Sequence, residues 1–126
     1  MSNPKKLFHG LRTLTYYVSD MAAAKTWYSK VLGIEPYFDQ PFYAGYNVGG
    51  FELGIVPVEQ GTVLGNNVVT YLGVDDAKSS LQRLVSMGAT LHQDIQDVGE
   101  DILLGTVLDP FGNIFGVIQN PHFKIE

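Results

Sequence analysis

The chain has 126 residues, and its eight Lys or Arg against 13 Asp or Glu give a net charge of −5. This is the length of one ordinary domain, and a hydrophobic content of 45% is enough to build a core. The acidic balance argues against a nucleic-acid partner, because affinity for phosphates comes mainly from Lys and Arg. The chain has no Cys, which excludes disulfides, thiolate metal sites and cysteine nucleophiles.

Membrane and export signals are also missing from the sequence. No apolar run approaches the roughly 18 residues of a membrane-spanning helix. The first residues do not follow the charged-then-apolar pattern of a signal peptide. We therefore expect a cytoplasmic protein without a membrane partner.

The first half of the chain predicts a strand, a helix and three further strands. Residues 11–18 are rich in Tyr, Thr and Leu, as strands are, and Asp20 is a good helix N-cap. Gly33 ends the expected helix, because glycine takes the left-handed conformation cheaply. Short strands are then expected over 34–39, 42–48 and 51–56. The apolar face of the helix is formed by Ala24, Trp27, Tyr28, Val31 and Leu32.

The second half predicts the same order of elements. A strand over 69–75 leads to a helix that Asp75 or Asp76 caps and Gly88 ends. Strands are expected over 90–96, 102–108 and 113–118. The last two strands are joined by a turn at 109–112, where Pro and Gly occupy positions that favour a turn.

The two halves repeat at a constant distance, since 70 − 15, 71 − 16, 75 − 20 and 88 − 33 each give 55. Chance similarity of two capped amphipathic helices is the alternative, but the matched Thr-Tyr, Asp and Gly positions favour a true repeat. We predict one α+β domain over 1–126, with a β-α-β-β-β module at about 9–58, a linker at about 59–67 and a second module at about 68–120. The helices should cover one face of two mainly antiparallel sheets, and the other faces should enclose a cleft for a small molecule.

Four motifs together resemble the vicinal oxygen chelate superfamily, which contains glyoxalases, extradiol dioxygenases and bleomycin-resistance proteins. These motifs are the duplication itself, the helix end at 27–33, the Phe-Glu-Leu-Gly strand at 51–54 and the Asp-Pro-Phe-Gly-Asn turn at 109–113. The resemblance covers about residues 9–120. It implies the paired-module fold about a pseudo-twofold axis, and it leaves the reaction open because the fold hosts both enzymes and binding proteins.

The resemblance also implies where a divalent metal would be held in the metal-dependent members. The four ligand positions fall on Thr13, Glu52, Val69 and Gly116, and only Glu52 can be a ligand. Catalytic sites normally have three protein ligands, so we expect no metal and no other cofactor. A partner subunit that donates His9 or His122 is the route by which a metal could still bind, whereas His92 is expected to start a strand on the far side of a helix.

Strand alternation predicts which other residues line the cleft. If the four positions point inward, so do Thr15, Tyr17, Tyr71 and Ile114, together with Gly50, Gly54, Gly73 and Ile118. Tyr16 should point toward the helices instead. Tyr17 and Tyr71 either stack on a planar ligand or pack in the core or an interface, and the sequence favours neither reading.

Glu52 also has two readings. A pocket of low polarity would raise the pKa of its carboxyl group, which would make it a candidate catalytic base or an anchor for a cationic ligand group. Alternatively, Glu52 is tied structurally to Arg12 or to a backbone N–H.

These observations favour a metal-independent homodimer that binds a small molecule, possibly aromatic or cationic, as bleomycin-resistance proteins do. The alternative is a metal-dependent lyase, isomerase or dioxygenase of glyoxalase type with an atypical ligand set. A metal-free isomerase or lyase with Glu52 as the base is the third reading. Abundant aromatic residues support the expected apolar dimer contact.

Overall fold

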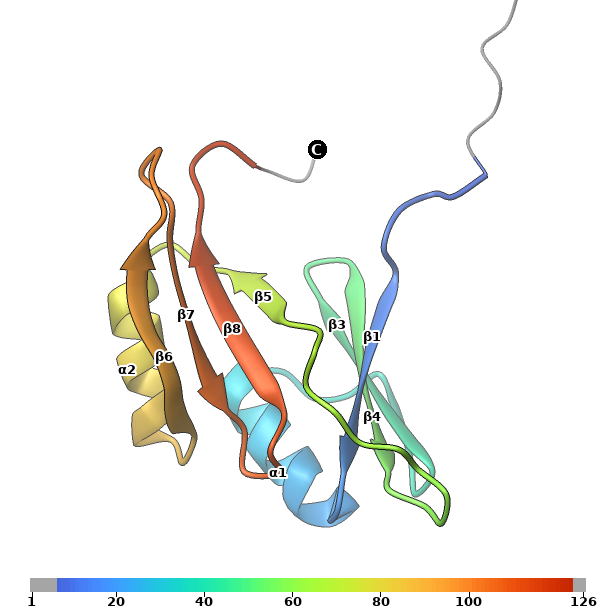
Figure 1. Ribbon diagram of the computed structural model, residues 1–126. Helices are drawn as coiled ribbons and strands as arrows, with labels where there is room; N and C mark the ends of the chain where they lie inside the picture. Colours follow the sequence, from blue (N-terminus) through green and yellow to red (C-terminus); the bar gives the residue numbers. More distant parts are fainter. Residues whose placement is uncertain (1–6, 124–126) are drawn as a thin grey trace, which may run out of the picture.

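The computed structural model describes residues 7–123, which form two successive β-α-β-β-β units (Figure 1). The first unit comprises β1 (Thr13–Val18), α1 (Met21–Leu32), β2 (Phe38–Gln40), β3 (Tyr43–Val48) and β4 (Phe51–Pro57). The second comprises β5 (Thr70–Gly73), α2 (Ala77–Ser86), β6 (Thr90–Asp97), β7 (Leu103–Leu108) and β8 (Ile114–Gln119). Neither helix within the described residues has the length and apolar character needed to cross a membrane.

Each unit forms its own four-stranded sheet. Sheet A has the order β1-β4-β3-β2, and sheet B has the equivalent order β5-β8-β7-β6. In both sheets the first strand pairs in parallel with the last, and the other two pairings are antiparallel. The predicted α+β class and the duplicated module are confirmed.

The strand β2 is shorter than the predicted strand at 34–39. Pro36 has no N–H to donate, so it cannot contribute to a sheet ladder. Pairing instead begins at Tyr37, whose N–H donates to the Gly45 carbonyl oxygen at 2.9 Å, and β2 continues from there.

Both helices begin at capping aspartates, but the repeat distance differs from the predicted value there. The Asp20 carboxylate accepts from the Ala23 N–H, and Asp76 accepts from the Ser79 N–H, each at 3.0 Å. The caps are therefore 76 − 20 = 56 residues apart. The predicted offset of 55 residues is therefore wrong for the first strand and the helix cap of each unit. In the second unit, the distance from the capping aspartate to the helix-ending glycine is one residue shorter than in the first.

This difference changes the alignment of two tyrosines. The offset of 55 pairs Tyr16 with Tyr71, but a one-residue shift along a strand moves a side chain to the opposite face. Tyr16 faces the core and is 8% exposed, as expected. Tyr71 lies beside Gly116 on the face of sheet B that points away from the helices.

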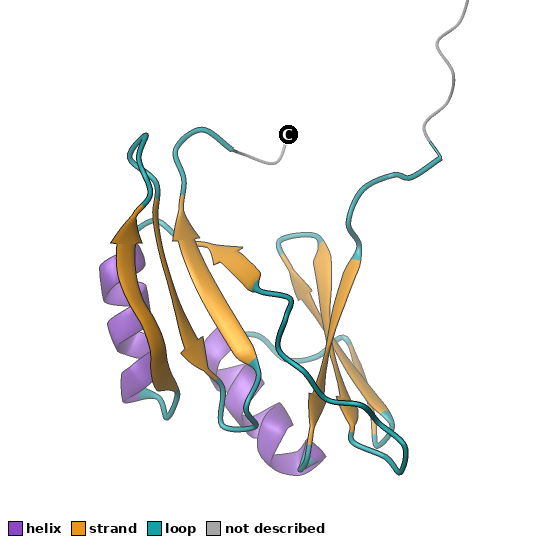
Figure 2. Ribbon diagram, in the orientation of Figure 1, coloured by secondary structure: helices purple, strands orange, loops and turns teal. Residues whose placement is uncertain are grey.

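The core is built around α1, which lies between the two sheets (Figure 2). Tyr28 of α1 is fully buried and packs against Tyr16 of sheet A and Phe115 of sheet B, with ring centroids 6.1 and 6.2 Å apart. The helix α2 covers sheet B alone through Leu81 and Leu84. One side of each sheet is therefore covered by helix, and we call the other side its open face.

The contacts between the two units lie away from the open faces. Hydrogen bonds between the two units lie on the covered side of the sheets or at its edge. Tyr16 Oη donates to the Ile114 carbonyl oxygen at 2.6 Å, and Trp27 Nε1 donates to the Met87 carbonyl oxygen at 2.9 Å. Because α1 fills the angle between the covered sides, the open faces point away from each other (Figures 1 and 2).

Candidate functional site

The open face of sheet A holds a cluster of hydroxyl groups around one carboxylate. Thr13 Oγ1 and Tyr43 Oη donate to Glu52 Oε1 at 3.0 and 2.8 Å, and Tyr37 Oη donates to Glu52 Oε2. We call these four residues the Glu52 cluster. Thr13 and Glu52 are predicted site residues, whereas Tyr37 and Tyr43 are not among the residues predicted for the site.

Two glycines make room for the phenol rings of the cluster. Gly45 and Gly54 lie opposite each other on β3 and β4. A Cβ at Gly45 would lie 2.7 Å from Glu52 Oε2, and a Cβ at Gly54 would overlap the Tyr43 ring. The paired glycines therefore let Tyr43 lie across the sheet with its hydroxyl on Glu52. The two glycines were the signal in the sequence that could have pointed to this site, because a glycine inside a strand often marks a place where other atoms approach the backbone closely.

The hydroxyl donors favour the ionised form of Glu52. The hydrogen bond from Tyr37, with smaller contributions from Tyr43 and Thr13, holds the pKa of the Glu52 carboxyl group below its ordinary value of 4.5. Burial and the bond to Glu52 raise the pKa of Tyr43 to about 12, and the bond to Glu52 raises that of Tyr37. The predicted increase in the pKa of Glu52 is wrong, because these donors outweigh its partial desolvation.

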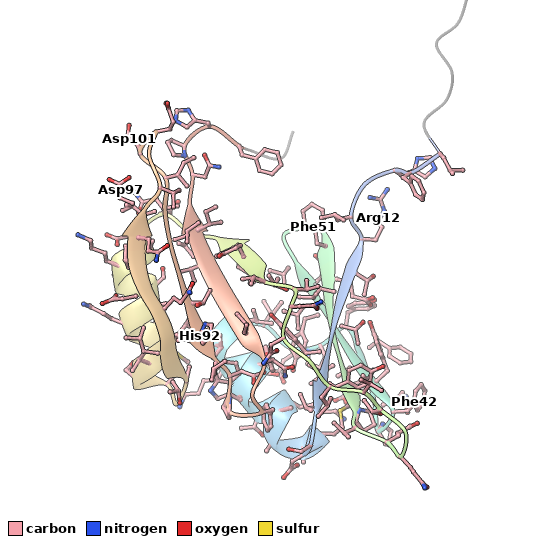
Figure 3. The ribbon with its side chains drawn as sticks, viewed as in Figure 1. Arg12, Phe42, Phe51, His92, Asp97 and Asp101 are labelled. Atoms are coloured by element: carbon pink, nitrogen blue, oxygen red, sulfur yellow. The ribbon has the colours of Figure 1, made fainter. Side chains whose placement is uncertain are left out.

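The alternative tie between Glu52 and Arg12 is also wrong. Arg12 Nη1 donates to the carbonyl oxygens of His9 and Leu11 at 3.0 and 3.4 Å, beyond the start of β1 (Figure 3). The Glu52 N–H donates to the Arg12 carbonyl oxygen, which is an ordinary contact of the parallel β1–β4 pair.

We expect Tyr37→Phe to raise the pKa of Glu52 toward 4.5, because the strongest donor to the carboxylate is lost. A lowered pKa stabilises the folded protein above the unfolded pKa, and this contribution disappears as the pH falls through the folded value. The variant should therefore lose less stability than wild type on acidification. Carboxyl ¹³C NMR titration measures the pKa. Tyr17→Phe is the control, and equal Glu52 pKa values in wild type and Tyr37→Phe would contradict the assignment.

The remaining site residues of the first unit share this open face. Thr15 and Tyr17 follow Thr13 at alternate positions of β1, and Tyr17 is 44% exposed. Phe38 of β2 is on the same face, since it pairs with Gly45. It contacts the ring of Tyr43 and that of Phe42, which Figure 3 places at the outer end of sheet A. The face is therefore aromatic and exposed around one carboxylate.

The site residues of the second unit lie on the open face of sheet B. Tyr71 and Gly116 are neighbours in the β5–β8 pair, and Ile114 lies on the same side of β8. Val69 lies just before β5 and is exposed. Thr13 and Glu52 are thus brought together, whereas Val69 and Gly116 belong to a different face of the chain.

His92 lies near the start of β6, the strand that follows α2, as expected, and its side chain is on the open face of sheet B (Figure 3). Its Nδ1 is 2.9 Å from Thr106 Oγ1. Gly105, which precedes Thr106 in β7, faces Leu81 of α2. Because successive side chains of a strand point to opposite faces of the sheet, Thr106 points to the open face. The pairing of β6 with β7 contains bulges, and the sequence pattern alone does not predict their positions.

The family's four metal positions do not fit a divalent cation here. Thr13 and Glu52 supply one hydroxyl and one carboxylate, and Val69 and Gly116 have no donor side chain. Within residues 7–123, no three His, Asp or Glu side chains gather closely enough to hold a metal ion. We therefore derive no chemistry through a metal.

Two surface hollows lie away from both open faces. One of about 330 Å³ lies between α2 and β6, beside Lys78 and Asp94. The other, of about 430 Å³, lies beside Lys30 near the end of α1. Neither includes a residue of the Glu52 cluster, so the open faces remain the place where the predicted site residues gather.

Comparison with known proteins identifies the family. The model of the Glyoxalase/Bleomycin resistance protein/Dioxygenase superfamily matches residues 10–117. The chain therefore belongs to this superfamily. A search of curated proteins found no match.

Solved structures have the same fold. A glyoxalase-related enzyme from Fulvimarina pelagi is 23% identical, with a TM-score of 0.79 over 94% of each chain. A glyoxalase/bleomycin resistance protein/dioxygenase family enzyme from Burkholderia phytofirmans PsJN is 20% identical, with a TM-score of 0.71 over 85% of this chain and 95% of that one. A glyoxalase/bleomycin resistance protein from Catenulispora acidiphila DSM 44928 is 24% identical, with a TM-score of 0.66 over 89% and 100%. At these identities the likeness supports the fold alone.

Proposed function

We propose that the protein is a metal-independent binder of small cationic aromatic molecules, with Glu52 as the anchor for the cationic group. The observation that carries this proposal is the Glu52 cluster, in which three hydroxyl donors favour the ionised carboxylate. A fixed negative charge beside phenol rings attracts ammonium and amidinium groups through both charge and cation–π contact.

The surroundings of the cluster suit the apolar part of such a ligand. Tyr17, Phe38 and Tyr37 expose about 44%, 40% and 65% of their surface on or beside the same face. Aromatic side chains stack well on planar ligands. The net charge of −5 also favours the approach of a cation.

A homodimer would account for the exposed apolar surfaces of both open faces. Large contiguous apolar patches usually mark an interaction site. Tyr17 of sheet A and Val69 and Tyr71 of sheet B are all more than one third exposed in the single chain. We therefore retain the homodimer as part of the proposal, and cytoplasmic localisation as a prediction from composition.

Catalysis with Glu52 as the base is less well supported. A general base works best when its pKa lies near the operating pH. The donors move the pKa of Glu52 in the opposite direction, away from neutrality. The binding function therefore fits the electrostatics of the site better than an isomerase or lyase does.

Glu52→Gln tests the proposal directly. We expect benzylamine, tryptamine and benzamidine to bind the wild-type protein, and the variant to bind them about tenfold more weakly, which corresponds to ~1.4 kcal/mol. Isothermal titration calorimetry measures the affinities, and thermal shift checks that the variant is folded. Benzyl alcohol serves as the neutral probe.

Glu59→Gln is the matched control, because it removes the same charge from an exposed residue beyond β4. It should leave the affinities unchanged. Equal binding of benzylamine by wild type and Glu52→Gln, or equal binding of benzylamine and benzyl alcohol by wild type, would contradict the proposal.

A further inference from the structure

The Glu52 carboxylate has one acceptor site that its neighbours leave free. A carboxylate offers about four such sites, two on each oxygen. Oε1 accepts from Thr13 Oγ1 and Tyr43 Oη at 3.0 and 2.8 Å, and Oε2 accepts from Tyr37 Oη. Among residues 7–123, no other side chain donates to Glu52. Both sites of Oε1 are therefore filled, and the free site is on Oε2.

The hydroxyl groups of the Glu52 cluster can accept hydrogen bonds from a ligand but not donate to it. A hydroxyl group carries one proton and two lone pairs. Thr13, Tyr37 and Tyr43 each direct that proton at Glu52. Their lone pairs remain, and together with the free site of Oε2 they form a surface of acceptors. The polar end of a ligand must therefore bring the protons, as a cation with several N–H groups does.

Two classes of organic cation carry several N–H groups, and they match this surface differently. A planar amidinium or guanidinium group binds a carboxylate best through two parallel N–H···O bonds, one to each oxygen. At Glu52 only the bond to Oε2 can form, because Oε1 is already filled. A primary ammonium group is compact, and its three donors need not be parallel. It can donate to Oε2 and to the oxygen of Tyr37 beside it.

We propose that Thr13 is a specificity-determining residue, which makes the Glu52 site select primary ammonium groups over planar cations with two parallel donors. This inference rests on the proposed function, because it names the class of cation that the same site takes. The ligand class narrows from cationic aromatic molecules to aromatic primary amines.

Thr13 rather than Tyr43 controls the site of Oε1 that a ligand can reach. Thr13 opens β1 and is exposed, whereas Tyr43 is half-buried, with its ring lying against Gly54. The Oε1 site on the Thr13 side is therefore next to solvent. Without the Thr13 hydroxyl group, each oxygen of Glu52 would have a free site, and a planar cation could form both of its bonds.

Thr13→Ala tests this role, because it removes both the hydroxyl group and the methyl group beside Oε1. We expect the affinity for benzamidine, relative to that for benzylamine, to rise about tenfold in the variant, which is the effect of one added hydrogen bond to a charged group. Isothermal titration calorimetry measures both affinities. Thr13→Ser keeps the hydroxyl group and should retain the wild-type ratio. Thr90→Ala makes the same change at an exposed threonine that opens β6, and it should alter neither affinity.

A third probe separates the effect of the free acceptor site from that of the added space. Benzyltrimethylammonium is a bulky cation without any N–H group, so it can gain from space alone. Its affinity relative to that of benzylamine should be the same in Thr13→Ala as in the wild-type protein. An equal gain for benzyltrimethylammonium and benzamidine would mean that Thr13 limits the size of the ligand and not its hydrogen bonding, which would overturn the inference.

The outcomes separate this inference from the proposed function. An unchanged ratio in Thr13→Ala, or the same rise in Thr13→Ser, would overturn the role of Thr13, while weaker benzylamine binding by Glu52→Gln would still uphold the proposed function. Equal benzylamine binding by wild type and Glu52→Gln would overturn the proposed function and this inference with it. A rise in the ratio that persists when Thr13→Ala is combined with Glu52→Gln would place the second bond on a group other than Glu52, and would also overturn the role of Thr13.

Discussion

Replacing Tyr28 with alanine is expected to destabilise the protein by about 4 kcal/mol, the usual cost of truncating a large aromatic residue in a core. Tyr28 is fully buried and contacts Tyr16, Trp27 and Phe115, with ring centroids between 4.8 and 6.2 Å away. It lies where α1 joins the two sheets. Its loss should therefore weaken the contact between the units as well as the helix packing.

Tyr28→Phe separates the ring from its hydroxyl group. The hydroxyl donates to Asp109 Oδ2 at 2.6 Å, and burial with the nearby Asp109 charge raises the pKa of Tyr28. The phenylalanine variant should lose only about 1–2 kcal/mol, because the ring contacts remain. Urea unfolding followed by tryptophan fluorescence measures both values. A Tyr28→Ala variant within 1 kcal/mol of wild type would contradict the central position of this ring.

Asp109→Ala is expected to cost about 3 kcal/mol, because a buried acceptor is removed from several donors at once. Asp109 is 3% exposed. Its Oδ1 accepts from the Phe111 and Asn113 N–H groups, each at 2.8 Å, and Oδ2 accepts from Tyr28 and from Asn113 Nδ2. The same side chain thus fixes the β7–β8 turn and ties it to α1.

Asp109→Asn is the matched control for this prediction. Its side-chain oxygen can keep the two turn bonds, and its amide can donate to Tyr28, but the bond from Asn113 Nδ2 is lost, so a loss of about 1–2 kcal/mol is expected. A double-mutant cycle with Tyr28→Phe measures the coupling across the 2.6 Å bond. Additive free energies of unfolding would mean that the turn and α1 are not linked through this pair.

Local patterns were enough to predict most of the secondary structure. The capping aspartates, the apolar helix faces and the Asp-Pro-Phe-Gly turn are set by interactions between residues close in sequence. Their repetition gave the duplicated module, and strand alternation placed Thr13, Thr15 and Glu52 on one face. The exact start of β2 and the one-residue shift at Asp76 were missed, since both depend on which backbone groups pair across a sheet.

The candidate site was only partly predictable. Glu52 was found because it stands at a family position, but its donors lie 39, 15 and 9 residues away in sequence. Tyr37 precedes β2 and Tyr43 opens β3, so neither could be assigned to Glu52 before the register of the sheet was known. The direction of the Glu52 pKa followed from those contacts and not from burial.

The sequence by itself determined the two β-α-β-β-β units, the composition of their open faces and the loss of the family's metal donors. These properties depend on residue type and short-range spacing. Only the tertiary structure decided that three hydroxyl donors surround Glu52 and lower its pKa, that His92 is on an open face, and that the two faces point apart. The physical reason is that α1 buries Tyr28 between both sheets, and long-range packing of this kind leaves no local trace in the sequence.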